Sequence, residues 1–331
     1  MLVAQILSLL YNIVDRIYIA RIPSVGTTAL GAVGLCFPII VIITAFSNLF
    51  GSGGAPIFSI NRGKRNIKRA ETIMNTSFSM LCICGVALMV IGMLLASPIL
   101  VLFGASEEGL SYAYPYMMIY LIGTVPSMIA TGMNPFINAQ GYATSGMLSV
   151  TIGAVANLIL DPLFIFGLNL GIKGAAIATI ISQTLSAAYV FYFLRKKAEL
   201  KVRVLSKGEW KACRDDAKNI VSLGSAGFIM QLTNSLVTIC CNSVLSGIGG
   251  DVYISVMTIV SSVRQMVETP IYAINEGTSP ILSYNYGAQR PKKSQESYLC
   301  IDLYDIDLYS NCVERDYFRT GISDRNFQHR Q

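Results

Sequence analysis

Histidine and charged residues are scarce in this sequence, and their scarcity limits the chemistry it can support. The 331 residues contain one histidine, His329, and no two cysteines are spaced as CxxC. A structural zinc site and a catalytic set with a histidine base therefore lack their residues. Walker loops and the GxGxxG pattern of a nucleotide-binding strand are missing as well. We expect no enzymatic activity, no cofactor and no metal centre of this kind.

Charged residues make up only 13% of the chain, whereas 53% of the residues are hydrophobic and the mean hydropathy is +0.54. This balance is typical of a polytopic membrane protein. Most of the basic residues behind the net charge of +6 lie in loops between apolar runs, where they have a topological use and do not indicate a nucleic-acid partner. Most of the eight cysteines lie inside the apolar runs, unlike those of a secreted disulfide framework.

Eight apolar stretches are long enough to cross a bilayer, which takes roughly 20 helical residues. They are Leu2–Ala20, Leu30–Phe50, Ile73–Phe103, Tyr112–Met133, Met147–Phe166, Ile172–Leu194, Ile220–Leu245 and Val252–Leu282. The sequence therefore predicts an all-α, polytopic membrane protein with about eight transmembrane helices. Four tyrosines, Tyr112, Tyr114, Tyr116 and Tyr120, are expected to form a belt at the membrane interface.

Basic residues cluster in three of the loops. One cluster lies at Arg62–Arg69, a second at Arg195–Arg214 and a third at Arg290–Lys293. Loops rich in Lys and Arg remain on the cytoplasmic side of a membrane. We therefore expect a multi-pass protein of the cytoplasmic (inner) membrane in which these three loops and the N-terminus face the cytoplasm.

The segment Gly53–Arg69 recurs 224 positions later as Gly277–Lys293, with seven identical residues in register. Each copy follows an apolar run and precedes a basic cluster, which indicates a duplicated membrane unit. The predicted organisation is a six-helix lobe at 1–194, a cytoplasmic linker at 195–218 and the first two helices of a second lobe at 219–296. A complete duplication would give twelve helices in a two-lobe (6+6) architecture.

The sequence after Glu296 leaves the register of the repeat. The stretch Ile73–Phe103 is expected to recur there, but residues 297–331 carry many charges that hydrocarbon would not accommodate. We interpret this polar tail as the product of a frameshift that replaced four helices, with a genuine soluble tail as the alternative. The first helix has no cytoplasmic flank, so we interpret it as clipped and the chain as truncated.

Ionisable residues within apolar stretches are costly and usually functional. Asp161 is the strongest candidate, because Asn157 lies one helical turn before it and Pro162 disturbs the helix directly after it. Such a carboxylate can carry a proton or bind Na⁺ together with amide and hydroxyl oxygens. A buried Asp that caps a kink is the structural alternative. In the first helix, Asp15 is expected to face the bundle while Arg16 reaches outward.

The eighth stretch carries three candidates for lining a substrate cavity, namely Gln265, Glu268 and Glu276. Glu268 lies four residues after Arg264, so these two side chains can simply neutralise each other on one helix face. Glu276 corresponds to Ser52 in the repeat, so the repeated scaffold requires no acid there. It is either a cavity acid or a group at the cytoplasmic end of the helix.

Five segments carry a resemblance to a known family. They are YNIVDRIYIA at Tyr11–Ala20, the GxxPxxSxNxG pattern at Gly53–Gly63, ANLILDPLFIFG at Ala156–Gly167, GIKGAAIATIIS at Gly171–Ser182 and SPILSYNYGAQ at Ser279–Gln289. In this order and spacing they resemble the multidrug and toxic compound extrusion (MATE) transporters over about residues 1–296. The resemblance implies two six-helix lobes related by pseudo-symmetry, alternating access, and export of organic cations in exchange for H⁺ or Na⁺.

In the prokaryotic branch, the resemblance implies a cation site formed by Asp15, Asn157, Asp161 and Thr179, of which Thr179 rests on the resemblance alone. The coupling ion is H⁺ or Na⁺. Expected partners are small-molecule organic cations and the lipid bilayer, without nucleic acid or an obligate protein partner. One alternative is a lipid-linked saccharide flippase of the same superfamily, which would line its cavity with Arg or Lys. Another is a non-transporting membrane fragment.

Overall fold

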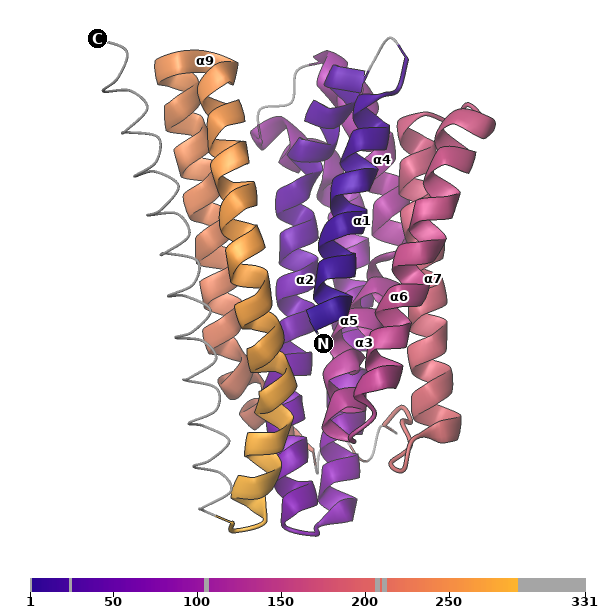
Figure 1. Ribbon diagram of the computed structural model, residues 1–331, viewed down its shortest axis with the longest axis vertical. Helices are drawn as coiled ribbons and strands as arrows, with labels where there is room; N and C mark the ends of the chain where they lie inside the picture. Colours follow the sequence, from indigo (N-terminus) through magenta and orange to yellow (C-terminus); the bar gives the residue numbers. More distant parts are fainter. Residues whose placement is uncertain (1, 24–25, 104–106, 206–208, 210–212, 291–331) are drawn as a thin grey trace, which may run out of the picture.

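The computed structural model describes residues 2–23, 26–103, 107–205, 209 and 213–290, and every regular element in them is helical. The elements are α1 (Leu2–Ala20), α2 (Gly26–Gly63), α3 (Ile67–Leu102), α4 (Glu107–Ile122), α5 (Thr124–Ala139), α6 (Ala143–Pro162), the π-helical turn η1 (Leu163–Gly167), α7 (Ile172–Tyr192), the π-helical turn η2 (Phe193–Lys197) and α9 (Arg214–Gly287). They form an elongated bundle with roughly parallel axes (Figure 1). The predicted all-α membrane fold is confirmed.

Among the described residues, five helices are long and apolar enough to cross a membrane, or six if a bent pair counts as one span. The bent pair corrects one sequence prediction. The stretch Tyr112–Met133 was expected to be one helix, but the chain bends by 55° between Ile122 and Thr124. Pro126 lacks the N–H that would bond the carbonyl of Ile122, and Gly123 instead donates to Tyr120 O at 2.9 Å. One helical span therefore becomes α4 and α5.

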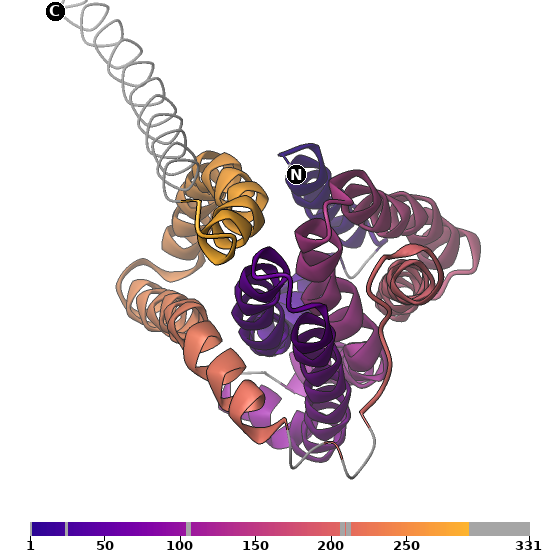
Figure 2. The ribbon, with the colours of Figure 1, turned by 90° about the horizontal axis from the view of Figure 1, so that it is seen from below.

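Helix α2 lies in the middle of the bundle (Figure 2). It packs against α3, α4, α5 and α9, and to a smaller extent against α1. Most of α2 is apolar, as expected of a helix with several helical neighbours, although Phe37 is exposed and Asn48 and Ser52 face the cavity. Its Phe58 is fully buried and meets Phe136 of α5 edge to face, with ring centroids 5.5 Å apart.

The 74 residues of α9 double back on themselves. A straight helix of that length would extend about 110 Å. The N-terminal half contacts α2 where Gly53 faces Gly224, and the C-terminal half contacts it where Gly63 faces Gly287. These contacts are only ten residues apart on α2, so the run must reverse direction, and Figure 1 shows its two halves side by side. The two predicted apolar stretches Ile220–Leu245 and Val252–Leu282 correspond to these halves.

The glycine contact at the end of α2 follows the sequence repeat. A side chain at Gly63 would collide with the carbonyl oxygen of Tyr284, and one at Gly287 would collide with that of Ile60. Gly63 and Gly287 are related by the 224-residue shift, and so are Ile60 and Tyr284. The two helices thus cross at a pseudo-twofold axis, with their backbones in direct contact.

The basic clusters lie at one end of the bundle. Arg62 forms an ion pair with Glu199 at 2.7 Å, and Arg69 forms one with Asp216 at 3.2 Å. The contact of Gly63 with Gly287 brings the start of the third cluster to the same end. This arrangement agrees with the predicted common side for the three loops. The proposed lobe boundaries stay predictions, and the polar tail at 297–331 lies outside the described residues.

Candidate functional site

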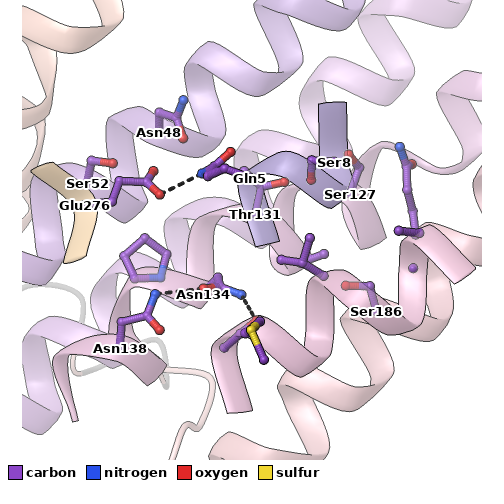
Figure 3. Close-up of a pocket in the computed structure, with 18 of the residues that line it drawn as sticks. Gln5, Ser8, Asn48, Ser52, Ser127, Thr131, Asn134, Asn138, Ser186 and Glu276 are labelled. Atoms are coloured by element: carbon purple, nitrogen blue, oxygen red, sulfur yellow. Dashed lines mark hydrogen bonds between the residues drawn. The ribbon is translucent and has the colours of Figure 1, made fainter. Parts of the chain in front are cut away.

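A cavity of about 490 Å³ is lined by α1, α2, α5, α6, α7 and the C-terminal half of α9 (Figure 3). Many of the lining residues carry amide or hydroxyl side chains, although the exposed surface of the wall is mainly apolar. The amide and hydroxyl residues are Gln5, Ser8, Tyr11, Asn48, Ser52, Ser127, Thr131, Asn134, Asn138, Asn157, Thr179, Ser182, Gln183, Ser186, Asn275 and Ser279. Glu276 is the one ionisable carboxylate among the described lining residues, and neither Arg nor Lys is among them.

The cavity wall also follows the repeat. Ser52, Ala55 and Pro56 of α2 line it, and so do their partners at the 224-residue shift, Glu276, Ser279 and Pro280 of α9. Figure 3 shows Ser52 beside Glu276. The cavity therefore straddles the same pseudo-twofold axis on which Gly63 and Gly287 meet. The walls from α2 and α9 have equivalent backbones, but Ser52 on α2 corresponds to the acidic Glu276 on α9.

An amide network rigidifies one wall of the cavity. Asn134 donates to the carbonyl oxygen of Gly146 at 2.9 Å and to the hydroxyl of Ser149 at 2.7 Å. Since these donors point toward α6, the Asn134 carbonyl is left to accept from Asn138, at 2.9 Å. The orientations of both amides are therefore fixed by their partners. Gly146 leaves room for Asn138, because a side chain there would collide with Asn138 Oδ1.

The two predicted carboxylates come together. Asp161 of α6 and Asp15 of α1 lie within hydrogen-bonding reach of each other, and Asn157 Nδ2 donates to Asp161 Oδ1 at 3.0 Å. Asp161 is 1% exposed and Asn157 is 3% exposed. One oxygen of each carboxylate, Asp15 Oδ1 and Asp161 Oδ2, is buried without a hydrogen-bond partner among the described residues. Two unpartnered carboxylate oxygens at this depth suit a proton or a cation.

Asn157 connects the carboxylate pair to the cavity, because it lines the cavity and also bonds Asp161. Thr179 lines the same cavity, but its hydroxyl donates to Ala175 O of its own helix at 2.9 Å. The structure thus brings Asp15, Asn157 and Asp161 into one cluster and places Thr179 on the adjoining wall. Pro162 ends the regular α-helix as expected, and the π-helical turn η1 follows.

Two tyrosines near the carboxylates were assigned wrongly from the sequence. Tyr116 and Tyr120 were expected at the membrane interface, but they are 3% and 5% exposed. Their rings stack at 6.2 Å, and Tyr116 lies within electrostatic range of both Asp15 and Asp161. Their four-residue spacing on one helix face could have indicated a buried pair. Tyr114, by contrast, is exposed.

Arg16 behaves as the sequence predicts. It is exposed on the outside of α1, with its guanidinium 5.6 Å from the ring centroid of Phe37. Of the three cavity candidates in the eighth stretch, Glu276 lines the cavity. The side chains of Gln265 and Glu268 lie outside those that the structure describes, so their assignment remains a prediction.

Two curated relatives illustrate the similarity to known proteins. The "Multidrug export protein MepA" of Staphylococcus haemolyticus is 27% identical over 293 residues, which are 88% of this chain and 64% of that protein. The "FAD transporter" of Shewanella oneidensis is 25% identical over 295 residues, with 87% and 64% covered. This chain therefore spans about 64% of the length of both relatives.

Solved transporter structures share the fold. A MATE protein in the straight conformation superposes with a TM-score of 0.86 at 25% identity, over 95% of this chain and 69% of the other. The bent conformation gives a TM-score of 0.84 with the same identity and coverage. The MatE family model matches residues 1–163 and 227–301. The chain therefore belongs to the MatE family, which confirms the family that its motifs resemble.

Proposed function

We propose that this chain works in a cation-coupled antiporter, which exports organic cations across the cytoplasmic membrane by alternating access. The observation that carries the proposal is the pairing of Asp15 with Asp161. Two facing carboxylates cannot both stay ionised in a buried site unless a cation joins them. Such a pair exchanges a proton, or a sodium ion, with the solution.

The surroundings of the pair suit both coupling ions. Asn157 uses its Nδ2 on Asp161, which leaves its amide oxygen as a ligand for a metal cation. Carboxylate and amide oxygens are hard ligands of the kind that Na⁺ takes, and the same carboxylates can hold a proton. Asp15 and Asp161 come from different helices, so binding a cation between them favours one arrangement of α1 against α6. Ion binding is thereby linked to conformation.

The cavity supports a cationic substrate. Glu276 supplies a negative charge, and the described lining contains no Arg or Lys. A lipid-linked saccharide would need basic groups to bind its pyrophosphate. The described lining offers none, which disfavours the flippase alternative. The multidrug export proteins among the relatives agree with an export function.

The test is substrate exchange in proteoliposomes that contain the purified chain. An imposed H⁺ or Na⁺ gradient should drive uptake of a fluorescent organic cation, and Asp161→Asn should abolish it without reducing membrane insertion. Asp216→Asn is the matched control, because Asp216 pairs with Arg69 at the end of the bundle. Wild-type uptake in Asp161→Asn would refute the assignment. A wild-type chain that inserts but moves no cation under either gradient would favour the non-transporting fragment.

A further inference from the structure

We propose that the π-helical turn η2, at the end of α7, binds the headgroup of an anionic phospholipid. Three consecutive cations, Arg195, Lys196 and Lys197, form this turn together with Phe193 and Leu194. The three cations are exposed, whereas Phe193 and Leu194 are buried. The turn is therefore anchored by its apolar residues and presents its charges outward. This surface lies outside the cavity, and its role does not depend on the antiport proposal.

The charges of η2 are not neutralised within the described part of the chain. Three ion pairs are formed there, and each uses a different arginine. They are Arg62 with Glu199, Arg69 with Asp216, and Arg203 with Glu209. Glu199 follows η2 closely in sequence, yet it pairs with Arg62 at 2.7 Å. Like charges on adjacent residues repel one another, so an anion that joins the cations of η2 is favourable.

The geometry of the turn holds two of its cations against the side of α7. Hydrogen bonds in a π-helical turn join residues five apart. Lys197 lies five residues after Tyr192, and its Nζ is 5.9 Å from the centroid of that ring. The guanidinium of Arg195 lies 5.7 Å from the ring centroid of Phe191. Both side chains therefore reach back along α7 to aromatic rings, which attract the cations.

The side of α7 that carries Tyr192 is an outer surface of the bundle. Leu185 lies about two helical turns before Tyr192 on the same face, and the two side chains are 46% and 52% exposed. Tyr142 is also exposed, and its ring meets that of Phe193 in η2 at 5.2 Å. Exposed tyrosines are typical of the level at which a membrane meets water. The cations of η2 therefore lie at the level of the lipid headgroups.

A phospholipid matches both parts of this surface. Lys and Arg bind phosphate oxygens by charge-assisted hydrogen bonds, and a guanidinium can use two donors at once. Clusters of basic residues beside a membrane helix attract anionic lipids. The acyl chains of a lipid bound at η2 would run along the exposed face that carries Leu185 and Tyr192. A soluble phosphate compound would use the charges but not this face, so the combination indicates a lipid.

The turn between α2 and α3 provides a matched comparison. It lies at the same end of the bundle as the end of α7 (Figure 1). Lys64, Arg65 and Lys68 are exposed there, and within the described residues they form no ion pair and stack on no aromatic ring. They carry the same charge as the cations of η2 without its aromatic and apolar surroundings.

The experiment measures lipid binding to the full chain in a neutral detergent by native mass spectrometry, which resolves single bound lipids. It compares phosphatidylglycerol with phosphatidylcholine of the same acyl chains. Wild-type protein should bind its first phosphatidylglycerol about 5-fold more tightly or better, which is the effect of one cation near an anionic lipid. Equal affinities for the two lipids would overturn the proposal.

Two triple variants decide whether η2 is the site, and both replace exposed side chains. They are Arg195→Gln/Lys196→Gln/Lys197→Gln and Lys64→Gln/Arg65→Gln/Lys68→Gln. The first should lose the preference for phosphatidylglycerol, and the second should keep it. Arg195→Lys/Lys197→Arg, which preserves the charge, should keep it as well. Equal losses in the two triple variants would show that net charge decides, and would contradict a site at η2.

A soluble headgroup separates a lipid site from a phosphate site. Glycerol 1-phosphate in large excess should leave phosphatidylglycerol bound to the wild-type chain, because it lacks the acyl chains. Its displacement of the lipid would show that η2 binds soluble phosphate compounds, which would overturn the assignment to a phospholipid.

Discussion

Gln140 is one of the residues that hold the linker against the helix bundle. Its Oε1 accepts from the Leu200 N–H at 2.9 Å, and its Nε2 donates to the Leu200 carbonyl at 3.4 Å. Asn75 and Ser79 of α3 accept in the same way from the backbone of Arg203 and Leu205. In the described part of this segment, Val202 also donates to the Leu194 carbonyl at 3.1 Å, and the side chains of Gln140, Asn75 and Ser79 satisfy further backbone groups.

Replacing Gln140 should loosen the linker selectively. Gln140→Leu keeps the side-chain volume but leaves the buried N–H and C=O of Leu200 without partners, at a cost of about 1–3 kcal/mol. Hydrogen exchange in peptides that cover residues 198–205 should accelerate. Glu199→Gln, which alters a half-exposed ion pair worth about 0–1 kcal/mol, should change exchange there much less. Unchanged exchange in Gln140→Leu would show that other contacts hold the segment.

The sequence predicts a contact between two side chains when the two residues are close in the chain. Asn157 and Asp161 were predicted as a pair because four residues on a helix place them on one face. Their proximity to Asp15 depends on how α1 packs against α6, and only the family resemblance indicated it. The hydrogen bond from Gln5 to Glu276 spans 271 positions, and no local pattern predicts it.

The crossing of α2 and α9 is the central feature at the scale of elements. Gly63 and Gly287 allow the two backbones to touch, and Gly53 and Gly224 do so further along α2. Small residues at helix crossings are typical of membrane proteins, in which close packing replaces the hydrophobic effect between helices. The contact at Gly63 lies on the same axis as the cavity and at the end that carries the basic loops.

Adding a methyl group at this crossing should destabilise it. In Gly287→Ala the new Cβ would collide with the carbonyl of Ile60, and overpacking of this kind costs about 1–3 kcal/mol. We expect a lower melting temperature in detergent and faster maleimide labelling of Ser279→Cys in the cavity wall. Gly227→Ala is the control, because open space surrounds Gly227. Equal melting temperatures for the two variants would contradict a close crossing.

Hydrophobicity located the helices but not their ends: the predicted stretch Leu30–Phe50 lies within α2, which runs from Gly26 to Gly63. The 224-residue repeat marked the two segments, Gly53–Arg69 and Gly277–Lys293, but it did not predict that Gly63 and Gly287 meet at a crossing. The break at Gly123 did not follow from hydrophobicity, because apolar residues continue on both sides of it, although Pro126 is a residue that bends helices. Tyr116 and Tyr120 of α4 were misplaced because they face the inside of the bundle, whereas Tyr114 is exposed.

In the whole molecule, the basic loops, the cavity and the carboxylate pair occupy different places along the bundle. The basic loops gather at one end, the cavity lies on the pseudo-twofold axis, and the carboxylate pair joins α1 to α6 beside the cavity. Asn157 connects the last two, because it contacts Asp161 and also lines the cavity. A cation between the carboxylates can therefore compete with, or assist, a ligand in the cavity. The central claim is that Asp15 and Asp161 share one exchangeable cation.

Infrared difference spectroscopy of the carboxyl groups tests that claim most directly. In wild-type protein, raising the pH or adding Na⁺ should remove the C=O stretching band of one buried carboxylic acid, because the shared proton leaves or is replaced. The band should be absent from Asp15→Asn and Asp161→Asn and present in Glu276→Gln. A wild-type spectrum without this change, or an Asp161→Asn spectrum that retains it, would contradict the account.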